Sequence, residues 1–67
     1  MENLEVRVVR TGAGWRVDRH AIGALETETL ARARTLMNAR QIAIANATRF
    51  RASGEFGNVR LMIEELF

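Results

Sequence analysis

A chain of 67 residues with no cysteine and a single histidine lacks the disulfides and metal ligands that support many very small domains. A domain of this length buries only about 60% of the surface that its unfolded chain exposes, so its core must be small and we expect a homodimer. The formal net charge is +2, no apolar run reaches the roughly 20 residues that cross a bilayer, and no charged segment precedes an apolar one at the N-terminus. We therefore expect one soluble, cytoplasmic α+β domain over residues 1–67 that has no membrane contact.

All ten basic residues are arginine. This usage has two explanations, which are the codon preference of a GC-rich genome and selection for planar groups that bind carboxylate or phosphate through two hydrogen bonds. Residues 29–54 contain five of these arginines and no acidic residue. We take these five as candidate partner-binding residues: Arg32, Arg34, Arg40, Arg49 and Arg51.

The N-terminal third predicts a β-hairpin. Apolar and polar residues alternate over residues 4–8 and again over residues 15–20, which is the period of a half-buried strand. Between these runs, residues 11–14 include two glycines, which is typical of a tight turn. The alternation puts Trp15 and Val17 on one face of the hairpin, and we expect Trp15 to anchor the core under a helix.

A helix is predicted to follow, capped by Thr27 or Thr29. On a helical wheel over residues 30–47, one arc holds seven apolar residues: Leu30, Ala33, Leu36, Met37, Ala43, Ile44 and Ala47. Arg40 falls inside this arc and Ile42 falls on the polar side. These exceptions leave open a helix that ends near residue 38, with a strand from residue 41. The alanine content favours a helix that continues to about residue 47.

A continuous helix requires an explanation for Arg40. A cation within the apolar arc must reach solvent at the edge of the helix or pair with an acid. The acids available are Glu64, Glu65 or a residue of another subunit.

The C-terminal part predicts a loop and a closing strand. Residues 53–58 include two glycines, a serine and an asparagine, which is typical of a loop. Residues 59–67 fit a strand with Val59, Leu61 and Ile63 facing inward, or a helix capped by Asn58. We favour the strand because a hairpin alone is marginally stable without a third strand or a covering helix. The fold class is therefore α+β, a small ββαβ domain with an antiparallel hairpin and a closing strand covered by one helix.

No group of residues suggests catalysis. His20 is the only imidazole, its one acidic neighbour on the same strand face is Asp18, and Ser53 lies in the predicted loop. The glycines at positions 12 and 14 are followed by a strand, whereas a phosphate-binding loop normally leads into a helix. We expect no enzyme activity, no metal site and no cofactor.

Several segments resemble the HicB-like antitoxin family: Val6-Arg7-Val8, Gly14-Trp15-Arg16-Val17, Gly23 and Thr29-Leu30-Ala31-Arg32-Ala33, the last similar to the T-L-x-x-A helix start of that family. The likeness covers roughly residues 4–47. It implies a ββαβ or βββα domain related to a partial RNase H fold without its catalytic carboxylates. It also implies a protein that dimerises and neutralises a small toxin.

These observations favour a non-catalytic protein-binding module of bacterial or phage origin, an antitoxin-like or inhibitor protein that neutralises a toxin or a host enzyme. The alternative is a small basic nucleic-acid-binding protein that contacts phosphates through an arginine-rich helix. The basic stretch has no interleaved aromatic residues on which bases could stack, and this weighs against the alternative.

Overall fold

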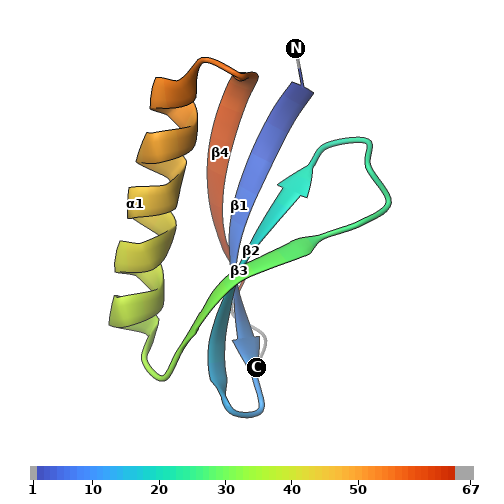
Figure 1. The fold of residues 1–67 in the computed structure, drawn as a ribbon. Coiled ribbons are helices and arrows are strands. Elements are labelled where there is room, and N and C mark those ends of the chain that lie inside the picture. Colours follow the sequence, from blue (N-terminus) through green and yellow to red (C-terminus); the bar gives the residue numbers. More distant parts are fainter. Residues whose placement is uncertain (1, 65–67) are drawn as a thin grey trace.

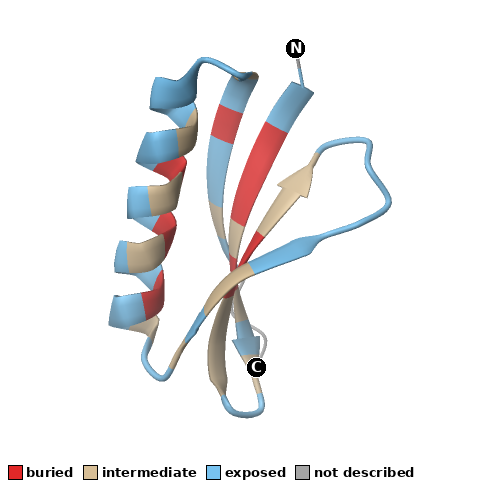
Figure 2. Cartoon of the chain, viewed as in Figure 1, coloured by how far each residue is buried: buried red, intermediate tan, exposed pale blue. Residues whose placement is uncertain are grey.

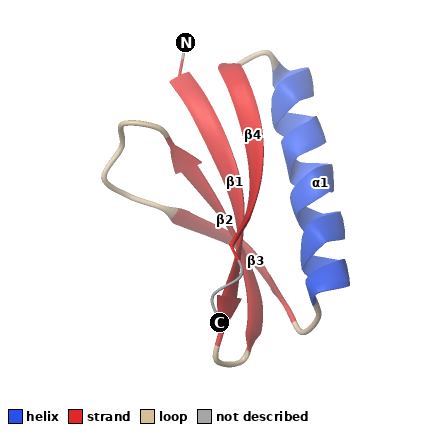
Figure 3. Ribbon diagram, turned by 180° about the vertical axis from the view of Figure 1, so that it is seen from behind, coloured by secondary structure: helices blue, strands red, loops and turns tan. Residues whose placement is uncertain are grey.

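Three strands, one helix and a fourth strand follow one another in the described part of the chain. The computed structural model describes residues 2–64. The elements are β1 (Glu2–Thr11), β2 (Gly14–Ala21), β3 (Glu28–Ala33), α1 (Leu36–Ser53) and β4 (Phe56–Glu64). The strands form one sheet in the order β3-β2-β1-β4, and α1 packs on one face of it (Figure 1). Viewed from behind, the described chain has no second helical layer, so the other face of the sheet is uncovered (Figure 3).

The predicted hairpin is confirmed. β1 and β2 pair antiparallel from Leu4 opposite Ala21 to Thr11 opposite Gly14, which leaves a two-residue turn. Gly14 has a φ of +142°, and a Cβ at this position would lie 2.6 Å from the main-chain oxygen of Ala33. Glycine is therefore required here, because a side chain would collide with the backbone at the end of β3.

The prediction that a helix begins near Thr29 is wrong. Residues 28–33 form β3, which pairs antiparallel with β2 and brings Ala31 opposite Val17. Pairing with the free edge of β2 outweighs the helix propensity of this alanine-containing segment, since propensity is a weak preference that tertiary contacts override. The helix is capped instead by Thr35, whose hydroxyl oxygen accepts a hydrogen bond from the Asn38 amide at 3.2 Å.

The helix is continuous, so the alternative strand from residue 41 is also wrong. Its buried face is rotated from the predicted arc and consists of Ala39, Ala43 and Ala47, spaced four residues apart. These small side chains bring the helix close to the sheet, while the larger Met37 and Ile44 lie outside the core. Arg40 is exposed, which removes the conflict that the predicted arc created.

The closing strand is confirmed, and it pairs parallel to β1 with Val59 beside Leu4. The predicted loop over residues 53–58 is shorter than expected. Gly54 ends α1 in the left-handed conformation with a φ of +73°, and β4 already begins at Phe56. Residues 65–67, which include Glu65 and the end of the predicted strand over residues 59–67, lie outside the described residues.

The core lies between α1 and the centre of the sheet (Figure 2). Its buried residues come from all elements except β3: Leu4, Val6, Val8, Val17, Ala39, Ala43, Ala47 and Val59. Trp15 is half-buried and packs against this cluster at the hairpin end, with the Arg10 guanidinium 5.9 Å from its ring. No helix in residues 2–64 is long and apolar enough to cross a membrane.

Candidate interaction surface

The five arginines predicted to bind a partner do not form one surface. Arg32 lies on β3 and Arg34 in the connection to α1, so neither belongs to the helix. On α1, the Arg49 guanidinium lies 5.9 Å from the Phe50 ring and donates a hydrogen bond to Asn46. Arg51 donates a hydrogen bond of 2.9 Å to the main-chain oxygen of Val59. All five side chains are exposed, but they are distributed over three parts of the molecule.

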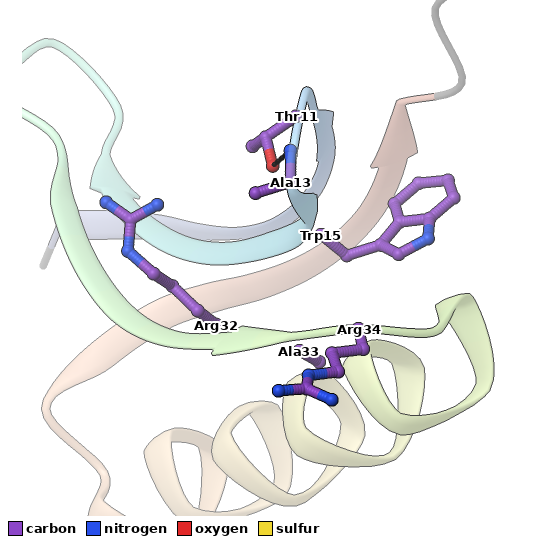
Figure 4. Close-up of a pocket in the computed structure, with 6 residues that line it drawn as sticks. All are labelled: Thr11, Ala13, Trp15, Arg32, Ala33 and Arg34. Carbon is purple, nitrogen blue, oxygen red and sulfur yellow. Dashed lines mark hydrogen bonds between the residues drawn. The ribbon is translucent and has the colours of Figure 1, made fainter.

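A small pocket lies where the β1–β2 turn meets the end of β3. Its volume is about 250 Å³, and Trp15, Arg32 and Arg34 line it together with Thr11, Ala13 and Ala33. Figure 4 shows the indole of Trp15 directed away from both guanidinium groups, which themselves point in different directions. Because the two guanidinium groups do not converge, they are not placed to bind one anionic ligand together.

The uncovered face of the sheet carries charges that neutralise one another. Glu5 and Asp18 are only 5% and 2% exposed although no helix covers them. The Nε of Arg16 donates to both carboxylate oxygens of Asp18 at 2.9 Å, and Arg7 pairs with Glu5. Each of the two buried carboxylates is thus paired with an arginine on the same face.

His20 lies on this same face, and its side chain contacts the connection between β2 and β3. Its Nδ1 is 3.1 Å from the hydroxyl oxygen of Thr27 and 3.3 Å from the main-chain oxygen of Glu26. These contacts give the one imidazole a structural role at the start of β3. Within residues 2–64, no group of three or more histidine or acidic side chains lies close enough to hold a metal ion.

A different surface stands out where α1 passes beside β4. Four large apolar side chains are exposed there: Met37 at 69%, Ile44 at 49%, Leu61 at 37% and Ile63 at 39%. We call these four residues the α1–β4 strip. A groove of about 490 Å³ runs along its helical half, lined by Leu36, Met37, Arg40, Gln41 and Ile44.

The periodicity of α1 brings the two halves of the α1–β4 strip together. Met37, Ile44 and Arg51 are seven residues apart and therefore share one side of the helix. The hydrogen bond from Arg51 to Val59 identifies this side as the one next to β4. On β4, Leu61 and Ile63 share the parity of the buried Val59, so their side chains lie on the helix-covered face of the sheet.

The main chain of β4 is open on its outer side. β4 is the last strand of the sheet, and no strand within residues 2–64 pairs with its outer edge. The Ile22 amide donates to the Asn3 oxygen, so the main-chain groups of Leu4, Val6 and Val8 face β4. In the observed register, Arg60 and Met62 then face β1, and the amides and carbonyls of Leu61 and Ile63 face outward.

The opposite edge of the sheet is protected. β3 has six residues against nine in β4, a bulge interrupts its pairing with β2 after Val17, and it carries the charged residues Glu28 and Arg32. Short length, bulges and charges are the features by which edge strands avoid pairing with other chains. On β4, Arg51 donates to the outward carbonyl of Val59, and no side chain of the described residues 2–64 forms a hydrogen bond with the outward main-chain groups of Leu61 and Ile63.

Sequence reasoning missed the α1–β4 strip. The predicted arc places Met37 and Ile44 in the core, because apolar residues at regular spacing normally indicate burial. Leu61 and Ile63 do lie on the predicted inner face of the closing strand, but they are partly exposed there. The signal that was available is Arg40, whose position between Met37 and Ile44 marks this side of the helix as exposed.

No family model, curated protein or solved structure matches the chain.

Proposed function

We propose that the chain is a non-catalytic protein-binding module of the antitoxin or inhibitor type, which neutralises a partner protein in the cytoplasm. The observation that carries the proposal is the open outer edge of β4 beside four exposed apolar side chains. Exposed apolar patches next to polar groups are typical of protein interaction sites. An open strand edge is a second such feature, since it offers unpaired main-chain donors and acceptors to another chain.

The test is co-expression with the product of an adjacent small gene. We expect the two proteins to co-purify, and we expect this chain to rescue cells from any growth arrest that the neighbour causes. A chain that binds no neighbouring product and rescues no toxicity would contradict the proposal.

The proposal includes a homodimer, since the small core motivates self-association. Light scattering over a range of protein concentrations measures this directly. We expect a mass of two chains, and a monomer at the highest concentration would remove the dimer from the proposal.

Nucleic-acid binding is the competing function. It is supported by Arg32, an exposed cation on the uncovered sheet face that lies opposite Arg16, whose own charge is offset by Asp18. Fluorescence anisotropy with a short duplex and a single strand at two salt concentrations tests it. Phosphate contacts require an affinity that falls steeply with salt, so an affinity that does not change with salt excludes this function.

A further inference from the structure

We infer that the outer edge of β4 binds an extended segment of the partner protein as a fifth strand, and that this segment alternates apolar with acidic residues. The inference rests on the proposed function, because it assigns the site and the chemistry of the partner that the module binds. Three features of this edge select the ligand: the main chain, the apolar side chains and the charges.

The main chain determines that the ligand is extended. The outward amides and carbonyls of Leu61 and Ile63 recur at every second residue along β4, which is the spacing that a neighbouring strand satisfies. A docked helix has no free main-chain groups along its side and would leave these donors and acceptors without a partner. An added strand pairs with them directly.

The apolar side chains determine which residues occupy every second position of the ligand. Side chains of an added strand alternate between the two faces of the sheet. Those on the helix-covered face lie next to Leu61 and Ile63 and extend toward Met37 and Ile44 on α1. Because these four side chains are between 37% and 69% exposed, apolar residues at alternate positions of the ligand would remove them from water.

The charges determine which residues occupy the intervening positions of the ligand. Arg60 projects from β4 on the uncovered face, where the intervening residues of the ligand would lie. Arg40 and Arg51 flank the α1–β4 strip on the helix. Within residues 2–64, none of these three arginines forms an ion pair, whereas Arg7, Arg16 and Arg19 each pair with an acid elsewhere. Carboxylates at the intervening positions of the ligand would supply a partner for Arg60, while Arg40 and Arg51, on the helix-covered face, add to the positive charge along this edge.

A second copy of the chain fits this surface poorly. Pairing two β4 edges about a twofold axis would place Arg40, Arg51 and Arg60 of both copies at one interface, and none of these arginines forms an ion pair within residues 2–64. Like charges at an interface oppose association. The occupant that complements the surface is therefore an acidic segment of another protein.

The experiment uses the full chain and two synthetic peptides of about eight residues, one alternating valine with glutamate and one alternating valine with lysine. Amide chemical shifts measured by NMR during titration report where each peptide binds. We expect the glutamate peptide to shift Leu61, Ile63, Met37 and Ile44, and the lysine peptide to bind at least about tenfold more weakly. No shift with the glutamate peptide, equal binding of the two peptides, or shifts confined to other elements would overturn the inference.

Two matched pairs of variants test the parts of the surface. Leu61→Ser should weaken binding of the glutamate peptide by about tenfold, while Leu25→Ser, at a fully exposed leucine in the β2–β3 connection, should leave it unchanged. Arg60→Glu should weaken the glutamate peptide and strengthen the lysine peptide, while Arg34→Glu should change neither. Thermal unfolding of each variant establishes that it is folded before it is titrated.

The outcomes separate this inference from the proposed function. If the neighbouring gene product binds and Leu61→Ser binds it as tightly as the unmodified chain does, the module binds proteins through another surface and the inference fails alone. If no partner protein binds, both the inference and the proposed function fail. A dimer that Leu61→Ser dissociates in light scattering would identify a second copy as the occupant and overturn the assignment of an acidic partner.

Discussion

Asp18 shows how a single charged residue can be buried on a sheet face that no helix covers. Its carboxylate is 2% exposed and accepts two hydrogen bonds from Arg16, whose own side chain is 35% exposed. The single Nε–H of Arg16 is shared between the two carboxylate oxygens. The pair therefore offsets a buried negative charge on this face, which the alternation of polar residues along β2 did not indicate.

Arg16→Met tests this interaction. The substitution leaves a buried carboxylate without its donor, and we expect a loss of about 1–2 kcal/mol in the free energy of unfolding, at the lower end for charged hydrogen bonds because Arg16 is partly exposed to solvent. Urea denaturation measures the loss. Arg34→Met, at an exposed arginine, should change stability by less than about 0.5 kcal/mol, and equal losses in the two variants would mean that the Asp18 pair contributes nothing.

Gly14→Ala tests the close approach between the hairpin and β3. The added Cβ would meet the Ala33 oxygen at 2.6 Å and force a side chain into a positive φ, so we expect a loss of roughly 1–3 kcal/mol. Gly12→Ala is the matched control, because no atom lies within 4 Å of its added Cβ. Thermal or urea unfolding of both variants compares them, and a Gly14→Ala protein as stable as the control would contradict this role.

At the scale of elements, the sequence predicts strands better than it predicts the helix. Alternation over residues 4–8 and 15–20 identifies β1 and β2 because one face of each packs on the core, so the period of two is visible locally. β3 has no such signal. Residues 28–33 become a strand because they pair with β2, and that pairing depends on partners 9 to 18 residues earlier in the chain, from Arg19 opposite Glu28 to Trp15 opposite Ala33.

The face of α1 could not be predicted for a related reason. A helical wheel weights large apolar residues, whereas the observed contact is made by Ala39, Ala43 and Ala47. Small residues let the helix approach the sheet closely, and the bulky Met37 and Ile44 then fall beside the contact. The consequence is that the residues with the strongest hydrophobic signal are the ones left for an interaction surface.

Ala43→Leu tests the close packing of α1. A larger side chain between α1 and the sheet should overpack the core and cost about 1–3 kcal/mol. Ala45→Leu makes the same change at an exposed position of the same helix and should have little effect on the free energy of unfolding. If Ala43→Leu were stabilising in urea denaturation, α1 would have to lie farther from the sheet than described.

At the scale of the whole molecule, the arrangement leaves the two edges of one sheet unequal. The β3 edge is short and has its bulge in mid-strand, whereas the β4 edge is longer, has its register shift at its start, between Phe56 and Asn58, and is bordered by the α1–β4 strip. This surface combines residues 37 and 44 with residues 61 and 63. It depends on which side of α1 faces β4, so no local pattern in the sequence predicts it. The predicted arginines contribute to it through Arg40 and Arg51, while Arg32, Arg34 and Arg49 lie elsewhere.

Amide hydrogen exchange on this chain, free and in complex with its neighbouring gene product, tests the role of the β4 edge most directly. In the free chain, the outward amides of Leu61 and Ile63 should exchange faster than the amides of Arg60 and Met62, which face β1. In the complex, the exchange of Leu61 and Ile63 should slow to match their neighbours, because an added strand accepts hydrogen bonds from both. A complex that forms while these two amides still exchange at their free rate would contradict the assignment of β4 as the binding edge.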